Sequence, residues 1–163
     1  MSQLALGDGY CLDANVIIDL CRRRYPKHRF RRLWEQFDSL LAMGLVAAPE
    51  EVLIELERQE GNSAFEWARS NKGIFVPPDV AQLTVVSELL AAMPKLVEAV
   101  ALRTKPGFGD PFVVALAEVR GWTAVTDEGI GKEGSPQIPR MCMLRGVHCI
   151  TLIGLFDEQN WDL

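Results

Sequence analysis

Apolar positions along this chain alternate between short runs of about four residues and longer stretches with helical spacing. Strand-like runs occur at 9–12, 45–48, 122–126 and 148–152. Helices are expected at 15–23, 26–43, from Pro49, at 62–71, 79–93 and 110–119, in a short segment ending at Arg145, and in a short tail after the last strand. Because strands alternate with helices, the pattern predicts an α/β fold with a central parallel sheet flanked by helices.

Glycine, proline and aspartate mark several of the predicted boundaries. Gly44 and Gly121 are expected to end helices, and Asp79 is expected to cap the helix 79–93. Pro94 should interrupt that helix. Glycine-containing loops are expected at 104–109 and 129–136.

Length and composition favour one soluble domain covering residues 1–163. The chain has 163 residues, 48% hydrophobic and 24% charged, with no internal repeat and no linker-like segment. Its apolar runs are shorter than the roughly 20 residues of a membrane span. The N-terminus lacks a basic start followed by an apolar core, so we expect no signal peptide, no membrane association and a cytoplasmic location.

Cysteine and histidine offer little chemistry. The four cysteines form no C-x-x-C pair and are expected to be free thiols: Cys11, Cys21, Cys142 and Cys149. The two histidines are too few and too far apart to indicate a histidine metal site.

Charge is distributed unevenly along the chain. The net charge is -5, yet the segment 22–32 contains seven basic residues and no acid, while the rest of the chain carries 10 basic and 22 acidic residues. This asymmetry favours either a local patch for a polyanion or a solvated turn between two helices, and the sequence leaves both open.

Acidic residues recur where predicted strands end or helices begin. Asp13 ends the first strand, Asp110 precedes Pro111 at the start of a helix, and the pair Asp127–Glu128 ends the strand 122–126. Parallel strands end at one edge of a sheet, which is where open α/β folds bind ligands. Glu55, a little over one turn into the helix that begins at Pro49, lies within reach of the same edge.

Each acid also has an ordinary structural interpretation. Asp13 and Asp110 are in positions suited to capping helices, and Glu55 shares its helix with other glutamates that suggest a solvated face. Asp127 and Glu128 could be loop residues. Together, however, clustered carboxylates repel one another and require a counter-charge, which Mg²⁺ or Mn²⁺ supplies. Such a cation activates water and stabilises phosphoryl charge, so the pattern predicts a metal-dependent nuclease or phosphatase.

Four segments carry a more specific resemblance. The sequence reads LDANV at 12–16, PEEVLIEL at 49–56, GDPFVVALA at 109–117 and AVTDE at 124–128, with further support from 138–139 and 149–150. From about Tyr10 to its C-terminus the chain resembles PIN-domain proteins of the VapC toxin type. The resemblance is strongest to a PIN-like branch once grouped under a domain of unknown function.

The resemblance implies a PIN-like three-layer fold and a Mg²⁺- or Mn²⁺-dependent endoribonuclease, the toxin of a type II toxin–antitoxin pair. It further implies an RNA substrate, a cognate antitoxin protein and a homodimer. Asp13, Glu55 and Asp110 match the first three family acids. The fourth is Glu128 or, as a close second, Asp127. Residue Asn15 would support the site by hydrogen bonds and Thr126 would help position the metal ligands.

Under this hypothesis, metal-bound water attacks an RNA phosphorus atom in line with the leaving oxygen. The basic segment would contact RNA phosphates, with Tyr25 or Phe30 stacking on bases, or would receive acidic residues of an antitoxin. The candidate RNA-binding residues are Arg22, Arg23, Arg24, Lys27 and Arg29.

Two other functions stay open. A dehalogenase-type phosphatase also begins with a strand-end aspartate, but it needs a second aspartate two residues later, where this chain has Asn15. A catalytically degenerate PIN-like module that only binds is the non-enzymatic alternative, because the fourth motif departs from the family pattern.

Overall fold

A five-stranded parallel sheet forms the centre of the protein, in the order β3-β2-β1-β4-β5. The computed structural model describes residues 9–59, 63–102, 108–132 and 136–163. The predicted loops 104–109 and 129–136 therefore lie partly outside the described residues. The strands are β1 (Tyr10–Leu12), β2 (Val46–Pro49), β3 (Phe75–Val76), β4 (Thr123–Val125) and β5 (Cys149–Ile150).

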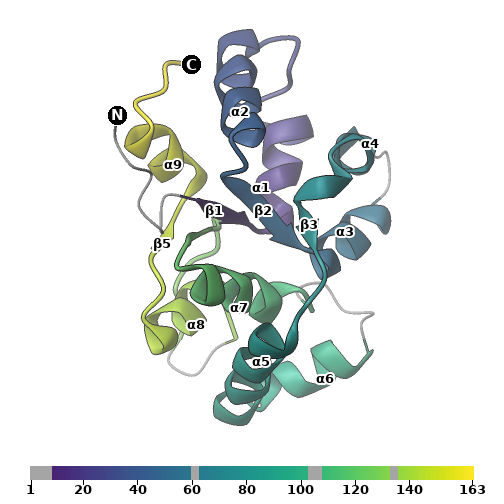
Figure 1. The fold of residues 1–163 in the computed structure, drawn as a ribbon, viewed down its shortest axis with the longest axis vertical. Helices are drawn as coiled ribbons and strands as arrows, with labels where there is room; N and C mark the ends of the chain where they lie inside the picture. Colours follow the sequence, from purple (N-terminus) through teal and green to yellow (C-terminus); the bar gives the residue numbers. More distant parts are fainter. Residues whose placement is uncertain (1–8, 60–62, 103–107, 133–135) are drawn as a thin grey trace.

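Helices cover both faces of this sheet, giving three layers (Figure 1). One face carries α7, which contacts β1, β2 and β4 and is itself covered by α5 and α8. The helices of this side are α5 (Val80–Ala92), α6 (Lys95–Leu102), α7 (Asp110–Arg120) and α8 (Ile138–Arg145). The opposite side holds α1 (Ala14–Ile18), α2 (Arg31–Ala42), α3 (Glu50–Glu57), α4 (Ser63–Ser70) and α9 (Leu152–Glu158). The predicted α/β fold is thus confirmed.

The core lies between the sheet and these helices. All residues of β1, β2 and β4 are buried, as expected for central strands covered on both faces. In α7 the run from Asp110 to Ala117 is buried without a break, so this helix runs through the protein interior. Its first residue, Asp110, therefore places a carboxylate in the protein interior.

Several predicted boundaries are correct. Asp79 precedes α5 and its side chain accepts a hydrogen bond from the Gln82 amide at 2.8 Å, which confirms the predicted cap. Gly121 ends α7 with φ of 68°, a left-handed conformation that glycine adopts without steric cost. All four cysteines are free thiols.

The predicted helix 26–43 is wrong at its start. The Pro26 carbonyl accepts hydrogen bonds from the amides of Arg29 and Phe30, which closes a turn, and α2 begins only at Arg31. The Trp34 indole donates to the Tyr25 carbonyl at 2.7 Å and fixes this turn against the helix. A tertiary contact thus overrides the helical spacing.

Three elements were not predicted from the pattern: β3, α6 and a short 3₁₀ helix at Lys72–Ile74. Strand β3 has two residues, too few to show a period, and it is added at the sheet edge through pairing with β2. Helix α6 restarts immediately after Pro94, whose carbonyl accepts a hydrogen bond from the Val97 amide at 3.1 Å. Proline before a helix is tolerated because the first amides have no partner within the helix.

The first predicted helix changes character along its length. Residues Ala14–Ile18 are α-helical, whereas Asp19–Arg23 form a π-helical turn, a rare geometry that often accompanies functional sites. Across the described segments of the chain, no helix is both long and apolar enough to cross a membrane.

Candidate active site

Asp13 follows β1 directly and is buried, with 2% of its surface exposed. Its backbone amide donates to the Val125 carbonyl of the neighbouring strand at 3.1 Å. Asp13 occupies the N-cap position of α1, yet its side chain makes no capping hydrogen bond there. Its carboxylate instead accepts a hydrogen bond from the Thr126 hydroxyl at 3.0 Å.

Asp110 is buried at the first turn of α7. The N-cap of that helix is Gly109, so the interpretation of Asp110 as the cap is wrong. Pro111 has no N–H to donate, but its place in the first turn costs no hydrogen bond, because an N–H at that position would have no partner within the helix.

Glu128 is positioned by two hydrogen bonds. Its amide donates to the Thr126 hydroxyl at 3.2 Å, and its carboxylate accepts from the Ile138 amide at the start of α8 at 2.9 Å. The Thr126 hydroxyl therefore joins Asp13 to Glu128.

Glu55 reaches the same region from α3. Its carboxylate accepts a hydrogen bond from the Gly109 amide at 2.7 Å, directly before Asp110. Glu51, one turn earlier, is buried at 3% exposure beside Gly109. The alternative interpretation of Glu55 as part of a solvated face is therefore not supported, because this side of the helix is turned toward the protein interior.

Electrostatic repulsion shows that four predicted acids come together. The pKa of Asp13 is raised to about 7: burial is the largest cause, the charges of Glu128 and Glu55 act in the same direction, and the Thr126 hydrogen bond opposes them. Burial also raises the pKa of Asp110 well above its usual range, with additional contributions from Asp13, Glu128 and Glu55. Isolated helix caps do not experience such mutual repulsion.

The other predicted acid, Asp127, is oriented differently. It is exposed, and its carboxylate accepts a hydrogen bond from the Leu152 amide at 3.0 Å. Asn15 is also exposed, and its side-chain oxygen accepts from Arg23 at 3.4 Å. Of the two acids proposed for the fourth position, Glu128 is thus the one that lies with Asp13 and Asp110.

Sequence reasoning missed Asp19. Its side chain is buried in the π-helical turn and forms an ion pair with Arg23 at 2.8 Å. Burial raises the pKa of Asp19, while Arg23 and Arg24 act in the opposite direction. The available signal was a carboxylate between Ile18 and Leu20 in an apolar run.

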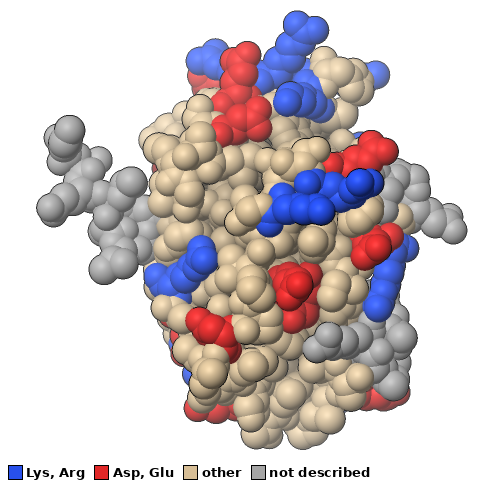
Figure 2. All heavy atoms as spheres, turned by 45° about the vertical axis from the view of Figure 1, so that its right-hand side comes forward, with Lys and Arg blue, Asp and Glu red and all other residues tan. Residues whose placement is uncertain are grey.

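The basic segment does not form one uniform patch, and Figure 2 shows basic and acidic side chains interspersed on the face it displays. Lys27 pairs with Asp38 at 3.7 Å, and Arg32 pairs with Asp162 at 3.1 Å. The Tyr25 and Phe30 rings, suggested for base stacking, pack edge-on against each other with centroids 5.3 Å apart.

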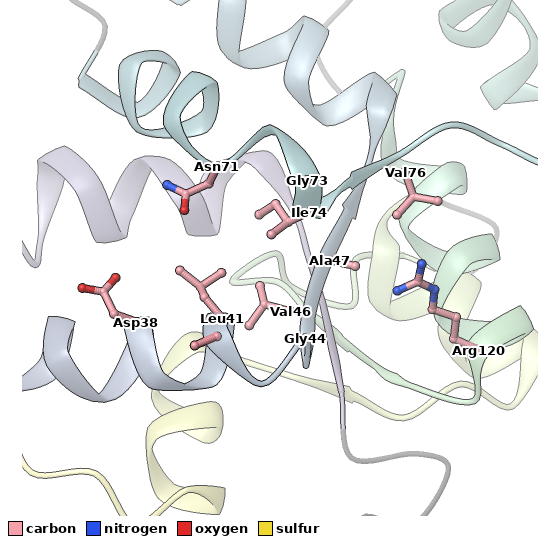
Figure 3. A pocket seen from close by; sticks show the side chains of 11 residues that line it. Asp38, Leu41, Gly44, Val46, Ala47, Asn71, Gly73, Ile74, Val76 and Arg120 are labelled. Carbon is pink, nitrogen blue, oxygen red and sulfur yellow. The ribbon is translucent and has the colours of Figure 1, made fainter.

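A cleft of about 550 Å³ lies away from the acids (Figure 3). It is lined by residues at the start of β2, among them Gly44 and Val46, and by Arg120 at the end of α7. Because the sheet is parallel, this is the amino edge, opposite to the edge where Asp13 lies. The cleft therefore takes no part in the acidic site.

Comparison with solved structures supports the fold. The crystal structure of FitAcB from Neisseria gonorrhoeae is similar, with a TM-score of 0.50 and 16% sequence identity over 86% of this chain and 96% of that chain. The observed three-layer arrangement with its parallel sheet is a PIN-like fold, as predicted. No curated protein sequence matches the chain. The family model described as "Domain of unknown function (DUF4411)" matches residues 10–163, and the chain therefore belongs to that family.

Proposed function

We propose that this protein is a Mg²⁺- or Mn²⁺-dependent endoribonuclease that hydrolyses RNA phosphodiester bonds. One observation carries the proposal: Asp13, Glu55, Asp110 and Glu128 converge from distant parts of the chain, and the charges of Glu55 and Glu128 help to raise the pKa of the two buried aspartates. Buried groups with strongly shifted pKa values at a sheet's carboxyl edge are typical of functional sites.

The donor chemistry of this group suits a hard divalent cation. All four side chains offer carboxylate oxygens, and their repulsion would be relieved by positive charge. Within the described segments, no three His, Cys, Asp or Glu side chains are already arranged around a metal position. The fit thus rests on the kind of donor, and Asp13, Asp110, Glu55 and Glu128 would hold the cation.

When bound, the cation would lower the pKa of a water molecule and offset charge on the phosphoryl group. The protein's own contribution is orientation of the acids. The Thr126 hydroxyl fixes Asp13 and the amides of Gly109 and Ile138 fix Glu55 and Glu128. Such fixed partners keep carboxylates in place for repeated binding.

The finer form of the proposal is that the protein acts as the toxin of a type II toxin–antitoxin pair. It rests on the resemblance of four sequence motifs to VapC-type proteins. A cognate antitoxin and a homodimer belong to the same proposal. Expression of the active protein should then arrest growth, and expression of Asp13→Asn should not.

Cleavage of a labelled single-stranded RNA tests the central proposal. The parent protein should cleave it with Mg²⁺ or Mn²⁺ and stop when a chelator is added. Asp13→Asn and Asp110→Asn should lower the cleavage rate by at least about 100-fold, because each removes a buried carboxylate that would hold the cation. Glu35→Gln changes an exposed acid of α2 and is the matched control.

Two outcomes would replace this proposal. Binding of RNA without metal-dependent cleavage would favour the degenerate binding module. Release of phosphate from a small phosphomonoester, with no RNA cleavage, would favour the phosphatase. Thermal unfolding offers a second readout, since a cation that binds the folded state should raise the melting temperature of the parent more than that of Asp13→Asn.

A further inference from the structure

A second cleft, of about 520 Å³, lies directly beside the acidic site. Glu128 belongs to both the cleft and the acidic group, so the two are continuous. The lining residues are Asn15, Asp19, Arg23, Arg24, Asp127 and Glu128.

Asp19 organises the basic wall of this cleft. Its carboxylate lies 2.8 Å from Arg23 Nε and 3.9 Å from Arg24 Nε. Arg23 Nη2 also lies 3.4 Å from both the backbone and the side-chain oxygen of Asn15. One guanidinium is thus held from two sides, while both arginine side chains stay more than half exposed at 51% and 60%.

The other basic residues of this segment with described ion pairs lie elsewhere. Lys27 pairs with Asp38 on α2, and Arg32 pairs with Asp162 near the C-terminus. Neither lines the cleft beside Glu128. Of the basic residues in this segment whose ion pairs are described, Arg23 and Arg24 are therefore the two that line the cleft.

We propose that Arg23 and Arg24 bind a phosphate of single-stranded RNA next to the acidic site, and that Asp19 is the positioning residue that holds them there. The inference rests on the proposed function, because RNA as the substrate class is taken from it. A guanidinium presents five N–H donors, so Arg23 keeps donors for a phosphate while it stays paired with Asp19. Arginine suits phosphate because its planar fork can donate two hydrogen bonds together.

Besides Asp19, two acids line the cleft and oppose this role, Asp127 and Glu128. Asp127 is exposed and carries a carboxylate beside the two arginines, although the Leu152 amide donates to it at 3.0 Å. Asp19 forms an ion pair with Arg23, but burial and the neighbouring Asp127 still raise its pKa. Binding should therefore depend strongly on both guanidinium groups, since they offset these acids.

The test measures binding of a fluorescent single-stranded RNA to the whole protein in chelator, so that cleavage and binding are separated. Anisotropy is followed from about 50 to 200 mM salt, a range over which phosphate contacts weaken measurably. Arg23→Gln and Arg24→Gln should each weaken binding by roughly tenfold at low salt. Each should also reduce the salt slope, and the two changes together should reduce it by about 0.7, the value of one phosphate on a single strand.

Two controls separate position from charge and from folding. Lys95→Gln removes the same charge from an exposed site on α6 and should change neither affinity nor slope. Arg24 is 60% exposed and its carboxylate contact is 3.9 Å long, so Arg24→Gln keeps the test meaningful if Arg23→Gln does not fold.

Asp19→Asn tests positioning directly. Charge counting alone predicts tighter RNA binding after loss of a negative charge, whereas loss of positioning predicts weaker binding. The double variant Asp19→Asn/Arg23→Gln should lose less affinity than the sum of the two single losses, because both changes act on the Arg23 contact.

Unchanged affinity and slope in both arginine variants, or tighter binding by Asp19→Asn, would overturn the inference. A parent protein that binds RNA with these dependences but never cleaves it would instead sink the nuclease proposal and leave the inference standing. If cleavage is lost in Asp13→Asn but unaffected in the arginine variants, the nuclease proposal stands and the inference about Arg23 and Arg24 fails.

Discussion

At the scale of single residues, Thr126 links two of the clustered acids. It is buried, and its hydroxyl donates to Asp13 and accepts from the Glu128 amide. A hydrogen bond to a carboxylate favours the charged form. Thr126 therefore lowers the pKa of Asp13 against burial and the neighbouring acids.

Thr126→Val should raise the pKa of Asp13 above its value of about 7, because this hydrogen bond is lost while burial remains. We expect the acidic limb of the cleavage rate against pH to move upward, with roughly tenfold less activity at neutral pH. Thr84→Val is the control, since the Thr84 hydroxyl donates to the Val80 carbonyl on an exposed face of its own helix. An unshifted acidic limb would contradict this role of Thr126.

At the scale of elements, the junction of α3 with α7 fixes Glu55. A Cβ added at Gly109 would lie 2.7 Å from Glu55 Oε1, too close for the two atoms to coexist. Gly109 has φ of −79°, so another residue would meet no backbone strain there. A side chain at this position would therefore push the Glu55 carboxylate away from where it lies.

Gly109→Ala should displace Glu55 and lower RNA cleavage by on the order of 10- to 100-fold, since small misplacements of catalytic groups are costly. Gly73→Ala is the matched control, because a Cβ at Gly73 meets no atom within 4 Å. Kinetics of both variants on one RNA substrate make the comparison. Equal activity of the two would show that the position of Glu55 does not matter.

The N-terminal cap of α5 should contribute to the free energy of unfolding but not to RNA cleavage. Asp79→Ala removes the hydrogen bond to the Gln82 amide and should cost about 1 kcal/mol of unfolding free energy. Urea unfolding should show a lower midpoint with the same slope. RNA cleavage should stay unchanged well below that midpoint, because Asp79 lies outside the acidic group.

At the scale of the whole molecule, the buried acids link stability to pH. The folded state keeps a proton on Asp13 up to about pH 7, whereas an unperturbed aspartate has a pKa of 3.8. Between these values the folded state binds more protons than the unfolded state, so stability falls as pH rises. Asp110 contributes in the same direction.

In chelator, the free energy of unfolding should therefore decrease between about pH 4 and pH 7 and stay low above it. Asp13→Asn should flatten this dependence and be more stable than the parent near pH 8, by roughly 1 to 4 kcal/mol, since one pKa unit corresponds to about 1.4 kcal/mol. Urea unfolding at both ends of the range measures this. Rising stability toward high pH would contradict the burial of charged Asp13.

The sequence by itself determined the layers and the edge where the acids lie. Alternating strands and helices predict a parallel sheet, and residues that follow its strands must share one edge. That is why Asp13 and the pair Asp127–Glu128 could be named from their local positions. These features depend on neighbours along the chain, which a pattern of apolar residues records.

Only the tertiary structure decided which side chains meet. The hydrogen bond between Thr126 and Asp13 joins residues 113 positions apart. In the same region Glu128, and not Asp127, lies close enough to raise the pKa of Asp13. Burial of Asp19 and the division of the basic segment also follow from contacts between distant elements. Local pattern cannot specify these, because desolvation and charge pairing depend on the complete packing around each group.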